Sequence, residues 1–138
     1  MSMSRNGSIV FLVEDNPADI FFMRTALQSE GIDSSDVLVA QDGEKAIAFV
    51  ETMDTDPEAP CPQVILLDLN LPRASGMEVL RCLKRSARFS DVPVIIVTSS
   101  DAAADREEAA SLGANGYFLK PQNLDEYMKL GSIVKAVL

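Results

Sequence analysis

Five short apolar runs recur along the chain, and they constrain its fold more than any other feature. The runs lie at residues 8–13, 37–40, 64–67, 92–97 and 117–119. Continuous apolar runs of this length are typical of β-strands that are covered on both faces. Segments with apolar residues at helical spacing separate the runs, so strands alternate with helices. This alternation predicts a three-layer α/β/α sandwich with a five-stranded parallel sheet and five helices, joined by right-handed crossovers.

Local signals place the predicted helices. Asn16 and Pro17 supply a capping side chain and a proline at the first helical position, and Asp19 adds a negative charge in the first turn. We expect Gly31 to end this helix. Further helices are expected to begin at Asp42 and Asn123 and to cover residues 77–87 and 102–112. The segment 53–62, rich in proline and acidic residues, is expected to be a loop.

The chain has 138 residues, 47% of them hydrophobic, which suits one domain with a single core. We expect this domain to cover residues 8–138 and residues 1–7 to form a disordered tail. The residues beyond Lys120 suffice for the last helix alone, so no output domain is expected. No apolar run could span a membrane, and the first residues lack the hydrophobic stretch of a secretory signal, so we expect a cytoplasmic protein.

The composition disfavours several functions. A net charge of −9, with 21 acidic and 12 basic residues, argues against nucleic-acid binding, which normally needs an excess of Lys and Arg. The chain has no histidine, which excludes a Ser-His or Cys-His catalytic pair, an imidazole zinc site and a phosphohistidine on this chain. Cys61 and Cys82 have no neighbours at metal-ligand spacing and are expected to be free thiols.

Polar residues follow four of the apolar runs at the points where the predicted strands end. They are Glu14 and Asp15, Asp68 and Asn70, Thr98 and Ser99, and Lys120 and Pro121. Any one of them alone is more often a helix cap or a strand terminator than a functional group. In an open parallel sheet, however, the carboxyl ends of the strands form one edge, and ligands bind there. An acidic pair, an aspartate, a threonine and a lysine at this edge are hard to obtain from capping alone.

The carboxylates at this edge predict a bound cation. Two carboxylates about 4 Å apart repel each other by about 4 kcal/mol at an effective dielectric constant near 20. Oxygen ligands without His or Cys favour Mg²⁺, which commonly pairs with a phosphoryl group. A lysine and a threonine can bind phosphoryl oxygens, and an aspartate beside them can accept the phosphoryl group.

Four motifs together resemble the receiver domains of two-component response regulators, which have the CheY-like, flavodoxin-like fold. The motifs are "VEDN" (13–16), "LLDLNLPRASG" (66–76), "VTSS" (97–100) and "GYFLKP" (116–121). The second contains the D-x-x-x-P-x-x-x-G spacing, in which Pro72 and Gly76 are turn residues. The resemblance covers roughly residues 8–138.

The resemblance implies that Asp68 accepts a phosphoryl group from a phosphohistidine on a partner sensor histidine kinase. It also implies that Asp15 and Asp68 bind Mg²⁺ directly, that Glu14 acts through water, and that Asn70 acts through its backbone carbonyl. The protein would then be a phosphoacceptor signalling domain that assists its own phosphorylation and dephosphorylation, and not an enzyme with a separate substrate.

The resemblance further implies a group of phosphoryl-binding and switch residues. Lys120 would bind the phosphoryl group, Thr98 would be the switch hydroxyl, and Tyr117 the aromatic whose rotamer reports phosphorylation. Ser99 satisfies the family's need for a small residue after the threonine. The Lys120–Pro121 bond is often cis in the family, which would fix the direction of the lysine.

Two further features concern partners. "EDNPADI" (14–20) and "TSS" (98–100) resemble small stand-alone receivers that work with phytochrome-type and related hybrid histidine kinases. Apolar residues cover more than half of the circumference of the last helix. This excess indicates either a downstream partner or a homodimer through the fourth helix, fifth strand and fifth helix. A broad buried stripe with a frayed last turn explains the same pattern equally well. Phe21 falls off the apolar stripe of the first helix and is expected to be a single exposed aromatic.

Two alternative functions remain at the level of sequence. A haloacid-dehalogenase-like phosphatase also uses an aspartate nucleophile, Mg²⁺, Thr and Lys, but it normally has a second acid two residues after the nucleophile, where this chain has Asn70. A pseudo-receiver would bind partners without being phosphorylated, although this chain carries all the expected chemical residues.

Overall fold

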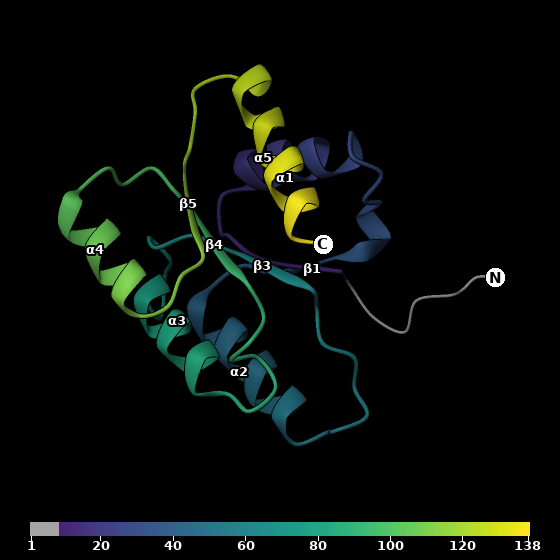
Figure 1. Ribbon diagram of the computed structural model, residues 1–138, viewed down its shortest axis with the longest axis vertical. Helices are drawn as coiled ribbons and strands as arrows, with labels where there is room; N and C mark the ends of the chain where they lie inside the picture. Colours follow the sequence, from purple (N-terminus) through teal and green to yellow (C-terminus); the bar gives the residue numbers. More distant parts are fainter. Residues whose placement is uncertain (1–8) are drawn as a thin grey trace.

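A five-stranded parallel sheet runs through the centre of the molecule in the computed structural model, which describes residues 9–138 (Figure 1). Its strands are β1 (Val10–Val13), β2 (Val37–Ala40), β3 (Val64–Leu67), β4 (Val94–Thr98) and β5 (Gly116–Leu119). Their spatial order is β2-β1-β3-β4-β5. The predicted tail 1–7 and the first residue of the predicted first strand, Ser8, lie outside the described residues.

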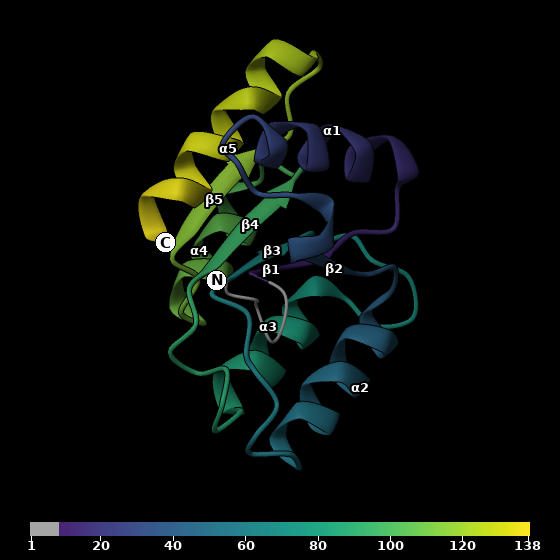
Figure 2. The same ribbon diagram turned by 90° about the vertical axis from the view of Figure 1, so that its right-hand side faces the viewer.

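Helices cover both faces of the sheet. They are α1 (Pro17–Gln28), α2 (Gly43–Asp54), α3 (Gly76–Arg85), α4 (Ala103–Ser111) and α5 (Leu124–Val137). α1 and α5 lie on one face, and α2, α3 and α4 lie on the other (Figures 1 and 2). The predicted three-layer sandwich with five parallel strands and five helices is therefore confirmed.

The strands divide their side chains between two hydrophobic cores. In β1, Val10 and Leu12 pack toward α1 and α5, whereas Phe11 and Val13 pack toward the helices on the opposite face. β3 alternates in the same way, and all four of its residues are fully buried. Successive side chains of a strand point to opposite faces, so a central strand covered by helices has to be apolar throughout. This is the reason for the continuous apolar runs.

Capping side chains begin the helices as the sequence indicates. Asn16 Oδ1 accepts hydrogen bonds from the backbone N–H groups of Ala18 and Asp19, and Pro17 is the first helical residue. Asp42 and Asn123 cap α2 and α5. At α3, Ser75 forms a capping box with Glu78, a signal that the sequence-based prediction did not use.

The bounds of several predicted segments differ from the structure; α3, for example, was predicted to reach residue 87 and ends at Arg85. Met53 and Asp54 belong to α2 rather than to the loop, because Arg88 Nη1 donates hydrogen bonds to the carbonyls of Met53 and Asp56 and thereby satisfies the end of the helix. The fourth strand begins at Val94 and includes Thr98. A short 3₁₀ helix, η1 (Ser34–Asp36), precedes β2 and was not predicted.

Within residues 9–138, none of the helices combines the length and the apolar character that a membrane crossing requires.

Candidate functional site

The predicted site residues meet at the carboxyl edge of the sheet, beside the point where the strand order reverses between β1 and β3. A cleft of about 580 Å³ opens there. Its lining includes the predicted residues Glu14, Asp15, Asp68, Ser99, Lys120 and Pro121. Glu14 and Asp68 directly follow β1 and β3, and Lys120 directly follows β5. The parallel register brings these residues together, since every strand ends at the same edge.

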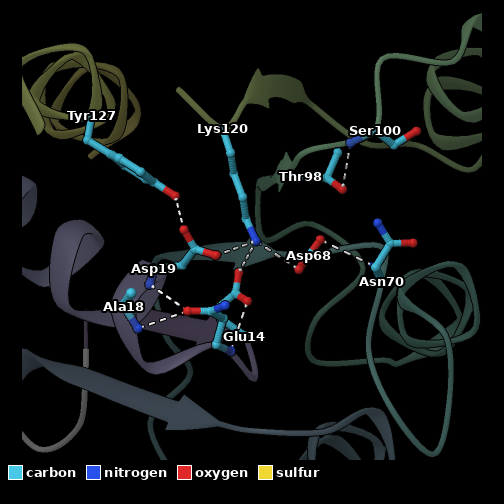
Figure 3. Close-up of polar contacts among 10 residues, drawn as sticks. Glu14, Ala18, Asp19, Asp68, Asn70, Thr98, Ser100, Lys120 and Tyr127 are labelled. Carbon is cyan, nitrogen blue, oxygen red and sulfur yellow. Dashed lines mark hydrogen bonds and ion pairs between the residues drawn. The ribbon is translucent and has the colours of Figure 1, made fainter. Parts of the chain in front are cut away.

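The ammonium group of Lys120 lies at the centre of the site (Figure 3). Its Nζ is 2.9 Å from Glu14 Oε1, 3.0 Å from Asp19 Oδ2 and 3.0 Å from Asp68 Oδ2. Burial alone would lower the pKa of Lys120, but the three surrounding carboxylates raise it above its ordinary value. The lysine is therefore a permanent positive charge at this edge.

Glu14 is the most buried carboxylate of the site, with a side chain that is 1% exposed. Burial raises the pKa of Glu14 to about 7; the nearby charge of Asp68 raises it as well, and Lys120 acts in the opposite direction. Its Oε2 accepts a hydrogen bond from the backbone N–H of Asn16, while Oε1 faces Lys120 as an ion pair without hydrogen-bond geometry. One lysine is too little positive charge for the carboxylates gathered here.

The acidic residues fit a divalent cation. Glu14, Asp15 and Asp68 each offer a carboxylate oxygen, and these oxygens all lie within 4.8 Å of one another. Asp15 is exposed at the mouth of the cleft, whereas Glu14 and Asp68 are buried. A set of oxygen ligands without His or Cys suits Mg²⁺ or Mn²⁺. The three predicted carboxylate ligands thus lie close enough together to hold one cation.

The loop after β3 fixes the backbone around Asp68. Asp68 Oδ1 accepts a hydrogen bond of 3.2 Å from the backbone N–H of Asn70. A Cβ atom on Gly76 would lie 2.2 Å from the carbonyl oxygen of Asp68, so this position has to be glycine. The carbonyl of Pro72 accepts hydrogen bonds from the N–H groups of Gly43 and Ala74 and ties the loop to α2. Pro72 thus lies in this loop, and Gly76 begins α3 against the backbone of Asp68.

Thr98 and Tyr117 lie beside the site rather than inside the lysine cluster. Thr98 is fully buried, and its hydroxyl oxygen accepts a hydrogen bond of 3.3 Å from the N–H of Ser100. The hydroxyl of Tyr117 donates to the carbonyl of Ser100 at 2.8 Å, and Arg106 lies 4.3 Å from the centre of its ring. Ser100 thus contacts both residues. Burial raises the pKa of Tyr117, which keeps this hydroxyl protonated as a donor.

The expected cis peptide between Lys120 and Pro121 is wrong for this structure, because the described residues contain no cis peptide bond. The trans isomer is also the ordinary preference before proline. Three carboxylates, and not the peptide isomer, direct the lysine side chain into the cleft.

Sequence reasoning missed Asp19 and Tyr127 as members of the site. Asp19 contacts Lys120, and its second oxygen accepts a hydrogen bond of 2.5 Å from the hydroxyl of Tyr127 on α5. The sequence suggests only a helix-dipole role for Asp19 and a place in an apolar stripe for Tyr127. Two signals could have found them: Asp19 lies in the first turn of the helix that begins just after Glu14 and Asp15, and a buried tyrosine hydroxyl needs a partner.

Comparison with known proteins gives a consistent picture. The sequence model of the response regulator receiver domain matches residues 10–130. Response regulator Rcp1 of Synechocystis sp. is 34% identical over 122 residues, which cover 88% of this chain and 82% of Rcp1.

Two solved structures are similar in fold and in sequence. The structure of the phosphorylated cyanobacterial phytochrome response regulator RcpA gives a TM-score of 0.80 at 34% identity, with 95% of this chain and 91% of that chain covered. The Mn²⁺-bound form of response regulator Rcp1 gives 0.80 at 32% identity, with 94% and 92% covered.

Proposed function

Because the chain belongs to the receiver-domain family of two-component response regulators, we propose that Asp68 is the residue on which it accepts a phosphoryl group. Receiver domains are signalling domains that histidine kinases phosphorylate, so a histidine kinase is the partner in this reaction. The observation that carries the proposal is the position of Lys120, whose ammonium lies 3.0 Å from an oxygen of Asp68 in the cleft.

The chemistry is transfer of a phosphoryl group between the two proteins. An oxygen of Asp68 forms a bond to the phosphorus of a phosphohistidine on the kinase, while the P–N bond breaks and its electron pair returns to the imidazole. The product is an aspartyl phosphate. Lys120 is placed to neutralise the charge on the transferred oxygens, and this kind of fixed electrostatic stabilisation is the main catalytic effect in phosphoryl transfer.

Asp15, Asp68, Glu14 and Asn70 are proposed to hold Mg²⁺ in the roles that the sequence implies. The bound cation would offset the negative charge that the carboxylates and the phosphoryl group bring together. The acidic cluster and the Mn²⁺-bound relative support this assignment. Burial raises the pKa of Glu14 to about 7. The positive charge of a bound cation would favour the ionised form of this carboxylate.

Thr98, Ser99 and Tyr117 are proposed to transmit the phosphorylated state. The phosphoryl group can shift the protein between two conformations only as far as it binds one of them better. Thr98 and Tyr117 both reach the β4–α4 loop through Ser100, so movement of Thr98 toward a phosphoryl group would alter the contacts of Tyr117. The readout surface in this proposal is α4, β5 and α5.

Two kinds of partner are proposed, an upstream kinase and a route of output. The likeness to Rcp1 and RcpA supports a phytochrome-type or related hybrid kinase. The output is proposed to pass to a separate downstream protein or through a homodimer. The two free cysteines support a cytoplasmic location.

The decisive experiment is labelling with radioactive acetyl phosphate in the presence of Mg²⁺. The wild type is expected to incorporate label, and Asp68→Asn and a chelator-treated sample are expected to lose it. Asp125→Asn is the matched control, since Asp125 is an exposed aspartate in the first turn of α5, outside the cleft. A wild type that takes up no label would make the protein a pseudo-receiver and would remove the proposal.

The same preparation tests the phosphatase alternative, which the receiver-domain match disfavours. Asn70 stands where that chemistry needs a second acid, and its backbone N–H donates to Asp68. We expect no turnover of phosphomonoesters such as p-nitrophenyl phosphate.

A further inference from the structure

A carboxylate outside the predicted metal cluster shares the lysine of the site. Asp19 Oδ2 lies 3.0 Å from Lys120 Nζ, and Oδ1 of the same carboxylate accepts the 2.5 Å hydrogen bond from Tyr127 (Figure 3). The two contacts span the chain, since Lys120 follows β5, Asp19 is on α1 and Tyr127 is on α5. The opposite oxygens of one carboxylate thus face the lysine and the tyrosine.

The ring of Tyr127 is held firmly, so its hydroxyl has a fixed direction. The residue is 1% exposed, and its ring lies 5.3 Å from the ring of Phe22 and 6.3 Å from that of Phe118. Burial raises the pKa of Tyr127, and the hydrogen bond to Asp19 raises it further, so the hydroxyl remains a donor across the physiological range. A hydrogen bond from such a fixed donor restricts the rotamer of Asp19.

The three carboxylates around Lys120 differ in what else they have to do. The ammonium group donates hydrogen bonds to Asp19 and Asp68 and forms an ion pair with Glu14. Glu14 and Asp68 belong to the acidic cluster that fits a cation, and Asp68 is also the proposed acceptor. Asp19 belongs to neither group. It can therefore keep its contact with Lys120 while the other two change partners.

We propose that Asp19, oriented by the hydroxyl group of Tyr127, is a positioning residue that holds the ammonium group of Lys120 at the phosphorylation site. This inference rests on the proposed function of Asp68. It gives α5 an indirect part in the chemistry, since the hydroxyl that orients Asp19 belongs to that helix. Tyr127 contacts neither the acceptor nor the metal cluster and acts only through Asp19 and Lys120.

The test compares rates of phosphorylation by acetyl phosphate at saturating donor and saturating Mg²⁺. Tyr127→Phe keeps the ring and removes the hydroxyl, and we expect the rate constant to fall by about fivefold, the effect of one hydrogen bond. Asp19→Asn keeps the shape and removes the charge, and we expect a fall of about tenfold or more, as for a hydrogen bond to a charged group. The Mg²⁺ dissociation constant of Tyr127→Phe, measured by calorimetry, should stay at the wild-type value.

The double variant separates positioning from a general loss of packing. If the hydroxyl acts through Asp19, Tyr127→Phe should have no further effect on the rate when Asp19 is already Asn. Val134→Ala is the matched control, since it removes buried apolar volume from the same helix and the same core but keeps the hydroxyl of Tyr127 and its aromatic neighbours. It should lower the melting temperature and leave the rate near that of the wild type.

A second readout does not depend on phosphorylation. The side-chain NMR signal of Lys120, in protein labelled at lysine, should shift in Tyr127→Phe and should not shift in Val134→Ala. Equal labelling rates for Tyr127→Phe and wild type would overturn the inference, and so would single-variant effects that multiply in the double variant. A wild type without label is a different result, because it removes the acceptor role of Asp68 itself.

Discussion

At the scale of single residues, the site concentrates negative charge that the described residues only partly compensate. Glu14, Asp19 and Asp68 share one ammonium group, and Asp15 adds a further carboxylate at the mouth of the cleft. Glu14 carries most of the cost, because it is buried and its ionised form is disfavoured. A bound cation should therefore stabilise the site. In the metal-free protein, the ionisation of Glu14 should lower the stability of the folded state.

The unfavourable ionisation of Glu14 predicts how the stability of the metal-free protein depends on pH. The pKa of Glu14 rises from 4.5 to about 7 on folding, so between these values the native state holds a proton that the unfolded chain has lost. The free energy of unfolding should then fall as pH rises through this window, by about 3 kcal/mol in total, and should be level above it.

Chemical denaturation in chelator at pH 5 and pH 8 measures the effect, with Glu14→Gln as the reference variant. The chain has no histidine that would titrate in the same range. The wild type should lose stability relative to Glu14→Gln as pH rises, whereas a constant difference between the two proteins would contradict the raised pKa.

At the scale of elements, the site depends on how α1 packs against α5. Gly131 of α5 lies against α1, and a Cβ atom there would be 2.3 Å from the carbonyl oxygen of Ala26. Glycine lets the two backbones approach closely, and the same approach brings Tyr127 to Asp19. The packing of two helices thus sets a hydrogen bond at the edge of the sheet.

Gly131→Ala should force α5 away from α1. Overpacking of this kind costs about 1–3 kcal/mol, and the better helix propensity of alanine returns up to about 1 kcal/mol. We expect a net loss of stability in urea denaturation. Gly116→Ala is the matched control, because its Cβ would meet Ile95 at an ordinary 3.5 Å. Equal stabilities for the two variants would show that α5 can move without cost.

At the scale of the whole molecule, exposed apolar side chains gather toward the end of the chain. They include Leu119 on β5, an edge strand of the described sheet, and Leu124, Ile133 and Val137 on α5. The prediction of excess apolar surface on the last helix agrees with this exposure. Phe21 is also exposed, as expected, but it lies apart from this group on α1. We expect a partner or a second copy to bind at this β5–α5 surface.

Sedimentation with Mg²⁺, with and without beryllofluoride, tests the homodimer. The wild type should shift toward dimer when beryllofluoride occupies Asp68, and Ile133→Asp should remain monomeric. Phe21→Asp places the same charge on an exposed apolar position of α1 and should still dimerise. A wild type that stays monomeric under both conditions would leave a separate downstream protein as the route of output.

Local sequence patterns are enough to predict the layers of the fold and most of the residues that line the site. Apolar runs, capping residues and the polar residues that end strands are local patterns, and burial on two faces leaves a strand little freedom in composition. The ends of elements also depend on residues far along the chain. At Met53, for example, a hydrogen bond from Arg88 to the backbone carbonyl extends α2 beyond its predicted end.

Only the tertiary structure decided which side chains share Lys120. Asp19 and Lys120 are 101 residues apart, and Asp19 and Tyr127 are 108 apart. Their contacts depend on the strand order, which places β5 and β1 in one sheet, and on the close packing of α1 against α5. Local patterns carry no information about such distances, because a helix cap and an apolar stripe look the same whether or not a lysine lies beside them.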